Sequence, residues 1–342
     1  MEFNTSWASP SNIALVKYWG KKPEGIQLPA NSSISFTLSH CKTITHLKYK
    51  EGDELSIKVL LDKKDEPSFV FKIEQFIKRI SDIFPFVTSG EYEINTTNSF
   101  PHSSGIASSA SGMSALALCI CDIASKKGLL DSKDFFQTAS HLARLGSGSA
   151  SRSIFGPLSI WGEHSDFVGS SDEFAIPYTK ASSIFNNYCD TILLVHKGQK
   201  SVSSSVGHNL VNNHPFSEAR FLQATENMIE IESTLQSADL DAFINIVERE
   251  ALTLHSLMMS SNPYFILMKP NTMNIINAIW EKRRTSNVKW CFTLDAGANV
   301  HFLYPSEEKE MAIQFIEKEL KQYCENGAFI HDCVGNGPEK IA

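Results

Sequence analysis

Residues 101–112 read PHSSGIASSASG, a run of mostly small side chains between a predicted strand and a predicted helix. From Ile106 to Ala124 apolar residues recur at helical spacing around most of the circumference, so we expect a central, buried helix. Small residues let the backbone close around a ligand, and a helix N-terminus offers free N–H groups to phosphate. The segment therefore predicts a phosphate-binding loop. A Ser-rich loop leading into a closely packed helix explains the same residues without a ligand.

The composition is that of a globular protein. The 342 residues are 42% hydrophobic and 20% charged, enough for two ordinary domains or one large one. A net charge of −7 argues against a nucleic-acid partner or an anionic membrane surface, because both are bound through basic patches. The seven scattered cysteines, the lack of a signal-peptide pattern and the lack of a long apolar run predict a cytoplasmic protein.

Outward from the loop, strand patterns dominate the first half of the chain and long helices the second. Strands are predicted at 12–19, 33–38, 43–49, 55–61, 92–96, 157–163, 174–178, 191–196, 290–294, 300–304 and 328–333. Helices are predicted at 71–84, 106–124, 132–146, 217–235, 240–258, 271–284 and 307–323. Without strict alternation of strand and helix, the pattern favours an α+β fold. A change of texture near 180–188 divides it into domains 1–185 and 186–342.

A second segment, SNIALVKYWGKK at 11–22, delivers Lys17 and Lys21 from an alternating strand beside Tyr18. Two ammonium groups and a phenol hydroxyl suit a polyanionic substrate. An edge strand whose lysines oppose aggregation accounts for the same pattern.

A third segment, ARLGSGSASRS at 143–153, sets Ser147 and Ser149 close to Arg152. Two hydroxyls and a planar guanidinium suit phosphate oxygens. A helix C-cap explains Gly146 without function, but it does not explain the Ser/Arg cluster that follows.

The fourth segment is TLDAGANVHF at 293–302, in which Asp295 ends an apolar strand before a glycine turn. A carboxylate there can align or deprotonate a substrate hydroxyl. It can equally brace the turn through hydrogen bonds to its own backbone.

In this order the segments resemble the GHMP small-molecule kinase superfamily, whose phosphate loop has the form P-x-x-x-G-[LI]-[GA]-S-S-A. That loop is formed here by Pro101, Gly105, Ile106, Ala107, Ser108, Ser109 and Ala110. More narrowly, five ordered blocks resemble the diphosphomevalonate decarboxylase family from about residue 7 to about residue 304. They are NIALVKYWGKK, LPANSSISFTLS, NSFPHSSGIASSASG, ARLGSGSASRS and TLDAGAN.

The resemblance implies a ribosomal-S5-like N-terminal domain and a ferredoxin-like C-terminal domain, with the active site between them. It implies that ATP, with Mg²⁺, phosphorylates the 3-hydroxyl of diphosphomevalonate. Phosphate and carbon dioxide then leave, and isopentenyl diphosphate forms. The expected partners are these two substrates and a second copy of the chain in a homodimer.

The resemblance also implies roles for individual residues. The catalytic groups would be Asp295, Lys17 and Arg152. The substrate would be bound by Tyr18, Lys21, Ser147, Ser149 and Arg152. ATP would be bound by Pro101, Ser103, Ser104, Gly105, Ala107, Ser108, Ser109, Ser203 and Ser204. Among these, the Ser109 hydroxyl would bind the magnesium ion.

Three positions depart from the family pattern: His102 stands for Thr, Ser151 for Cys and Ala298 for Pro. None of these changes removes a charge that the implied mechanism needs.

Three other functions fit parts of the pattern: decarboxylation of the monophosphate, phosphorylation alone by a mevalonate-type kinase, and nucleotide sensing without turnover. The combination of Asp295, Lys17 and Arg152 argues against a kinase that does not decarboxylate. A sensor would be expected to have lost Asp295 or the loop serines. A monophosphate substrate remains an alternative, because Lys21 and two serines do not distinguish one phosphate from two.

Overall fold

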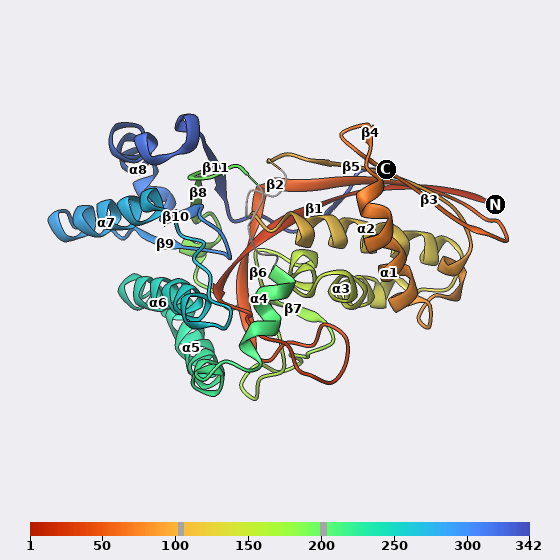
Figure 1. Cartoon of the computed structure of the whole chain (residues 1–342), viewed down its shortest axis with the longest axis horizontal. Helices are drawn as coiled ribbons and strands as arrows, with labels where there is room; N and C mark the ends of the chain where they lie inside the picture. The colour runs from red at the N-terminus through yellow and green to blue at the C-terminus, as the bar shows by residue number, and fades with distance from the viewer. Residues whose placement is uncertain (102–105, 199–203) are drawn as a thin grey trace.

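The computed structural model describes residues 1–101, 106–198 and 204–342. Within these residues the strands form two sheets, one in each of two α+β domains (Figure 1). The N-terminal sheet has the order β12 (Glu339–Lys340), β1 (Glu2–Val16), β2 (Ser33–Lys50), β5 (Gly90–Asn98), β3 (Leu55–Leu61), β4 (Lys64–Asp65). Strand β2 also pairs with β6 (Leu158–Trp161), and β6 pairs with β7 (Ala175–Tyr178). The C-terminal sheet has the order β11 (Phe329–Cys333), β8 (Cys189–Leu193), β10 (Val300–Tyr304), β9 (Cys291–Thr293).

Strands β1 and β2 form a long antiparallel ribbon that runs through the N-terminal domain toward the C-terminal one (Figure 1). The sequence patterns predict the second half of β1, but the structure starts this strand at Glu2. Proline lacks the N–H that strand pairing needs, so Pro10 argues against a strand in the first half of this segment. The structure accommodates it at a register shift between Pro10 and Asn12. β2 is likewise one continuous strand where two were predicted.

One helix forms the centre of the N-terminal domain. α2 (Ser108–Lys126) packs against β1, β2 and α3 (Phe135–Gly146), and α1 (Val70–Ile80) packs against α3. α2 is long and apolar enough to cross a membrane, but most of its residues are buried inside the fold, as in a core helix. The sequence-based prediction of a central, buried helix after the phosphate loop is thereby confirmed.

The C-terminal sheet has helices on both faces (Figure 1). One face packs on α7 (Pro270–Thr285) and α8 (Lys309–Phe315) through an aromatic-rich core. The other face joins α5 (Ser217–Ser237), α6 (Leu240–Ser260) and the β1–β2 ribbon in a second core. This second core contains residues of both domains, so the two domains bury apolar side chains against each other.

Two C-terminal segments differ from the prediction. The polar stretch 197–213 contains a short helix, α4 (Ser204–Val211), which its sparse apolar pattern does not indicate. The helix predicted at 307–323 is divided. The α-helical part, α8, ends at Phe315, and a π turn and a 3-10 turn follow it.

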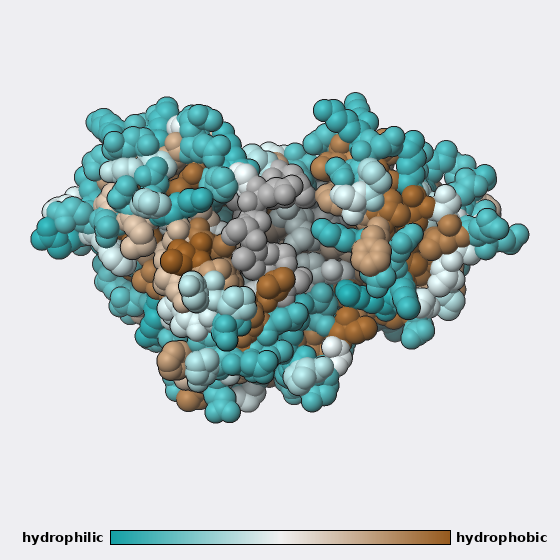
Figure 2. Space-filling model, in the orientation of Figure 1, coloured by the Kyte–Doolittle hydropathy of each residue, from teal (hydrophilic) through white to brown (hydrophobic). Residues whose placement is uncertain are grey.

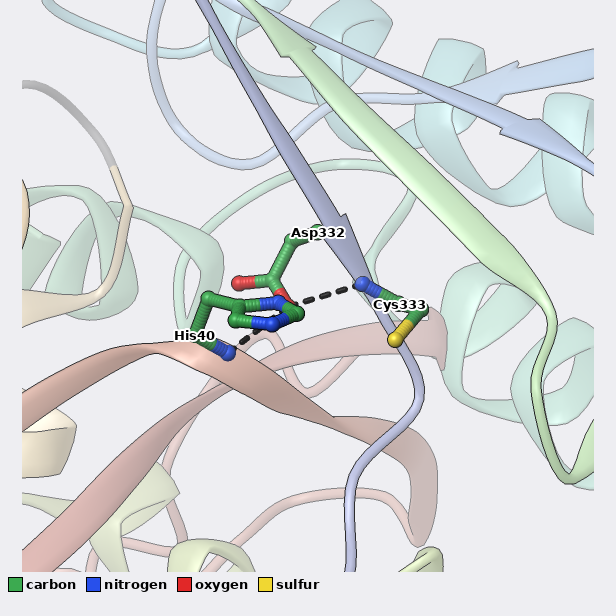
Figure 3. A group of neighbouring side chains, drawn as sticks. All are labelled: His40, Asp332 and Cys333. Carbon is green, nitrogen blue, oxygen red and sulfur yellow. Dashed lines mark hydrogen bonds and ion pairs between the residues drawn. The ribbon is translucent and has the colours of Figure 1, made fainter. Parts of the chain in front are cut away.

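After β11 the chain returns to the N-terminal domain, where β12 pairs with β1. The carboxylate of Asp332 joins the two domains at this point (Figure 3). It accepts backbone N–H groups from Ser39 at 2.9 Å, His40 at 2.8 Å, and Cys41 and Cys333 at 2.7 Å each. His40, Asp332 and Cys333 also bring potential metal-ligand atoms within 4.8 Å of one another. Because the carboxylate already accepts four N–H groups, we assign this cluster a structural role.

Candidate active site

An ion pair between the two domains marks the centre of the site. Lys17 directly follows β1, and Asp295 lies in the turn after β9. Lys17 Nζ lies 3.3 Å from Asp295 Oδ1; the lysine side chain is 2% exposed and the aspartate side chain 26%. The carboxylate is therefore the member of the pair that a substrate can reach. Burial lowers the pKa of Lys17, and the adjacent Asp295 opposes that shift by favouring the charged ammonium.

The Asp295 turn is fixed by its own backbone. The carbonyl of Asp295 accepts the Gly297 N–H at 2.7 Å and a ring N–H of His255, on α6, at 3.1 Å. The turn interpretation and the functional interpretation of this aspartate are thus compatible, because the turn uses the carbonyl, whereas Lys17 contacts the carboxylate.

A second, fully buried ion pair holds the backbone of Lys17. Its N–H donates to Glu250 at 2.8 Å, and its carbonyl accepts from Arg220 at 2.9 Å. Arg220 on α5 donates to both carboxylate oxygens of Glu250 on α6, each at 2.6 Å. A second donor to the Lys17 carbonyl is Asn31, at 2.9 Å. The Arg220–Glu250 pair thus connects the end of β1 to α5 and α6 of the C-terminal domain.

Arg152 lies in a short 3-10 helix, Gly148–Ile154, and its guanidinium is held by small polar side chains of the β1–β2 ribbon. It donates to Ser33 Oγ at 2.7 Å, Ser35 Oγ at 3.1 Å and Asn12 Oδ1 at 3.2 Å. All three of these acceptors are neutral. The arginine therefore keeps its positive charge available to an anionic ligand.

Burial lowers the pKa of Arg152 to about 10, and Asp295 opposes the shift, so the side chain is cationic at neutral pH. Its Cζ lies 5.9 Å from the centre of the Trp161 ring, within cation–π distance. Arg152 and Lys17 thus give this part of the molecule two buried cations, both electrostatically coupled to Asp295.

Tyr18 presents a buried hydroxyl to the same region. Its ring contacts those of Trp161 and His208, at centroid distances of 4.6 Å and 4.2 Å. A Cβ atom added to Gly148 would lie 3.1 Å from the Tyr18 hydroxyl, so this oxygen reaches the backbone between Ser147 and Ser149. The hydroxyl has no hydrogen-bond partner among the described residues. An unpaired buried hydroxyl is costly, which makes it a ready donor to a ligand oxygen.

Three further residues are predicted to bind the substrate: Ser147, Ser149 and Lys21. Ser147 caps α3 and Ser149 follows within the 3-10 helix, and both are partly exposed. Lys21 is half-buried, and burial lowers its pKa. Lys21 and Arg152 both act electrostatically on His208, so the two cations contribute positive potential to one region. Figure 2 shows the surface indented between the two domains.

Of the predicted ATP-binding residues, the structure describes the end of the loop. α2 begins at Ser108, with Ala107 at its N-cap in a left-handed conformation, φ 45°. The Ala107 side chain has no polar atom that could cap the helix, and the Ala110 N–H donates to the Ala107 carbonyl at 2.8 Å. The N–H groups at the start of a helix favour an anion. Ser109 is exposed and Ser108 half-buried. Pro101 is exposed as well.

Several predicted positions cannot be compared with the structure. Ser103, Ser104, Gly105 and Ser203 lie outside the described residues, as does the variant position His102. Ser204 is the first residue of α4, and only its backbone is described.

Sequence reasoning missed the residues that hold the functional groups in place. They are Asn12, Asn31, Ser33, Ser35, His208, Arg220, Glu250 and His255. Asn12 and Ser33 lie in the quoted segments, and small polar residues on a buried strand were a usable signal. Glu250 stands in a helix with charged neighbours, so nothing in the sequence separates it from a solvated charge.

Comparisons with known proteins agree with this geometry. Two α+β domains, with the buried helix after a Ser-rich loop, belong to the GHMP kinase fold, as the sequence predicts. The model described as the diphosphomevalonate decarboxylase-like N-terminal domain matches residues 9–175, and that of the mevalonate 5-diphosphate decarboxylase C-terminal domain matches residues 191–340. The chain belongs to the diphosphomevalonate decarboxylase family.

Individual relatives match along almost the whole chain. A diphosphomevalonate decarboxylase from Ganoderma lucidum is 28% identical over 339 residues, covering 94% of this chain and 83% of the relative. The crystal structure of mevalonate diphosphate decarboxylase from Staphylococcus aureus is 26% identical, with a TM-score of 0.87 over 100% of this chain and 99% of that one. MDDEF in complex with MVAPP, AMPPCP and magnesium is 26% identical, with a TM-score of 0.86 over the same shares.

Proposed function

We propose that this chain catalyses the ATP-dependent decarboxylation of diphosphomevalonate to isopentenyl diphosphate, with release of ADP, phosphate and carbon dioxide. The observation that carries the proposal is the contact between Lys17 and Asp295, 3.3 Å apart and made by the two domains together. A reachable carboxylate beside a buried ammonium, with the guanidinium of Arg152 nearby, is the set that phosphorylation followed by loss of phosphate requires.

The chemistry begins at Asp295. Its carboxylate accepts the proton of the 3-hydroxyl as the alkoxide oxygen bonds to the γ-phosphorus of ATP and ADP departs. The bond between the tertiary carbon and this oxygen then breaks, and the departing phosphate carries away its electron pair. Loss of carbon dioxide returns an electron pair to form the double bond. Lys17 and Arg152 stabilise the negative charge on the groups that leave.

The remaining residues bind the substrates. Tyr18, Lys21, Ser147 and Ser149 hold the diphosphate, because a free hydroxyl, an ammonium and two serines surround one positively charged region. The N-terminus of α2 holds the ATP phosphates together with Ser108 and Ser109. We assign to this site the rest of the predicted ATP-binding set: Pro101, Ser103, Ser104, Gly105, Ala107, Ser203 and Ser204.

Magnesium fits the same helix start. Mg²⁺ prefers oxygen ligands and keeps several waters, and the exposed Ser109 hydroxyl is such a ligand beside a phosphate site. When bound, the ion would neutralise the charge of the ATP phosphates. The relative crystallised with MVAPP, AMPPCP and magnesium supports both ATP and Mg²⁺.

We further infer domains 1–185 and 186–342, a cytoplasmic location and a homodimer. Strands β1 to β7 belong to one sheet and β8 to β11 to the other, which supports the domain division, although β12 returns to the first sheet. Six of the seven free cysteines are buried, which suits a reducing compartment. The homodimer rests on the family resemblance alone.

One experiment separates the proposed function from its alternatives. The protein is incubated with Mg²⁺ and ATP, and with mevalonate, its monophosphate or its diphosphate in turn. ADP, phosphate and carbon dioxide are measured together. We expect one carbon dioxide and one phosphate per ADP with the diphosphate. ADP without carbon dioxide would establish a kinase, preference for the monophosphate would change the substrate, and no turnover with any of the three would favour a sensor.

A further inference from the structure

Helix α4 packs closely against the segment that follows β1. The His208 ring lies 4.2 Å from the ring of Tyr18 and 4.4 Å from that of Trp19, between centroids. Its Nδ1 accepts the backbone N–H of Gly20 at 3.1 Å. A Cβ atom added to Gly207 would lie 2.6 Å from Trp19, so the glycine lets the helix approach this closely. Four contacts from two adjacent residues thus dock α4 on this segment.

The two rings that contact Tyr18 are supported differently. Trp161 lies on β6 of the N-terminal sheet, where its indole N–H donates to the Asp172 carbonyl at 2.9 Å. His208 comes from the C-terminal part of the chain, on a helix of eight residues. The orientation of Tyr18 therefore depends on where α4 docks.

His208 makes these contacts as a neutral ring. Burial, together with the positive charges of Lys21 and Arg152, lowers its pKa to about 3. At neutral pH its Nδ1 is consequently free to accept the Gly20 N–H, as the geometry requires. A protonated ring would lose that acceptor and add a third cation to the region.

We propose that His208 is a positioning residue, which holds the Tyr18 ring against Trp161 and so aims the Tyr18 hydroxyl at the diphosphate of the substrate. The inference rests on the function proposed above, in which that hydroxyl binds the diphosphate. Because the diphosphate is remote from the reacting carbon, loss of His208 weakens substrate binding more than it slows the chemical step.

A double-mutant cycle tests whether His208 acts through the hydroxyl. KM for diphosphomevalonate, KM for ATP and kcat are measured for the wild type, Tyr18→Phe, His208→Ala and the double variant. We expect each single change to raise KM for diphosphomevalonate roughly tenfold, the scale of one lost hydrogen bond to a charged group. The double variant should raise it no further than Tyr18→Phe alone. KM for ATP and kcat should change by less than about threefold, because neither involves the hydroxyl.

Conservative variants separate the two contacts of the ring. His208→Phe keeps an aromatic ring on Tyr18 without the acceptor for Gly20, whereas His208→Asn keeps an acceptor without the ring. We expect the phenylalanine to recover more of the wild-type KM. Asn209→Ala is the matched control, because Asn209 is the next residue of α4 and is exposed. It should behave as the wild type.

Additive effects of the two substitutions on KM would overturn the inference, because His208 would then act independently of Tyr18. Equal loss of ATP and diphosphomevalonate binding would overturn it too. If His208→Ala fails to fold, the cycle is run with His208→Asn. The same cycle is measured calorimetrically with inorganic diphosphate as ligand, which needs no turnover. Coupling in that assay, with no turnover by the wild type, would refute the proposed function and leave the positioning role of His208 standing.

Discussion

Asp295 and Lys17 form one ion pair but differ in exposure, 26% against 2% of the side chain. Substitutions of the two residues should therefore impair the reaction in different ways. Asp295→Asn keeps the shape of the reachable partner and removes its basicity. We expect kcat to fall roughly 10²-fold or more, the scale of a positioned general base. ATP binding, measured by titration, should persist. A kcat near that of the wild type would refute the role of this carboxylate.

Lys17→Met removes a buried cation while filling much of the same volume. Glu250, Arg220 and Asn31 contact the backbone at Lys17, so they remain to hold this segment. We expect phosphate release and carbon dioxide release to slow about 10²- to 10³-fold, as on loss of one electrostatic stabiliser.

A phosphorylated, undecarboxylated acid should then accumulate in reactions of the Lys17 variant that are quenched and examined by mass spectrometry. Lys22→Met is the control, because the Lys22 side chain is 43% exposed and pairs with Asp172 instead. Carbon dioxide release by Lys17→Met at the wild-type rate would exclude the assigned role.

At the level of helices, the pair between α5 and α6 is the feature with the largest predicted effect on stability. Glu250 and Arg220 are 0% and 1% exposed at their side chains. Glu250→Gln leaves the Arg220 cation buried without its counter-charge, which costs about 3–5 kcal/mol. Urea unfolding followed by circular dichroism measures the loss.

Glu230→Gln provides the comparison, because Glu230 and Arg249 also join α5 and α6, but at the surface, with side chains 52% and 46% exposed. Solvent screens such a pair, so we expect no measurable change in stability. Equal unfolding midpoints for the Glu250 and Glu230 variants would contradict the account of the buried pair.

For the molecule as a whole, Asp332 connects the domains where the chain returns from β11 to the N-terminal sheet (Figure 3). Asp332→Asn replaces one acceptor oxygen by an NH₂ group that faces a backbone N–H. We expect a loss of about 3 kcal/mol, the upper range for a hydrogen bond to a charged group. The amides of Ser39 to Cys41 should exchange hydrogen faster, as measured by mass spectrometry. Unchanged exchange there would show that the carboxylate does not join the domains.

Glu339→Gln is the control for that experiment. Glu339 lies on β12, in the same returning segment, and its exposed carboxylate is 3.9 Å from Lys42. Exchange at the Ser39 to Cys41 amides should be the same as in the wild type, which would assign the effect of the Asp332 substitution to its buried hydrogen bonds.

Several features of this protein follow from short stretches of its sequence. The buried helix after PHSSGIASSASG is predictable because apolar spacing records which faces are covered. Residue type determines charge and hydrogen-bonding capacity, so the sequence also identifies the candidate catalytic groups Lys17, Asp295 and Arg152. The prediction of a phosphate loop, the α+β class and the family all rest on such local information.

Only the tertiary structure determines what surrounds those groups. Glu250 is 233 residues from Lys17 in the chain, and Arg152 is 117 residues from Ser35. Periodicity shows that a face is buried but not which segment covers it. For the same reason the polar stretch that contains α4 gave no sign that His208 would stack on Tyr18. These contacts form only when distant segments pack together, because hydrogen bonds and ring contacts depend on distance in space rather than along the chain.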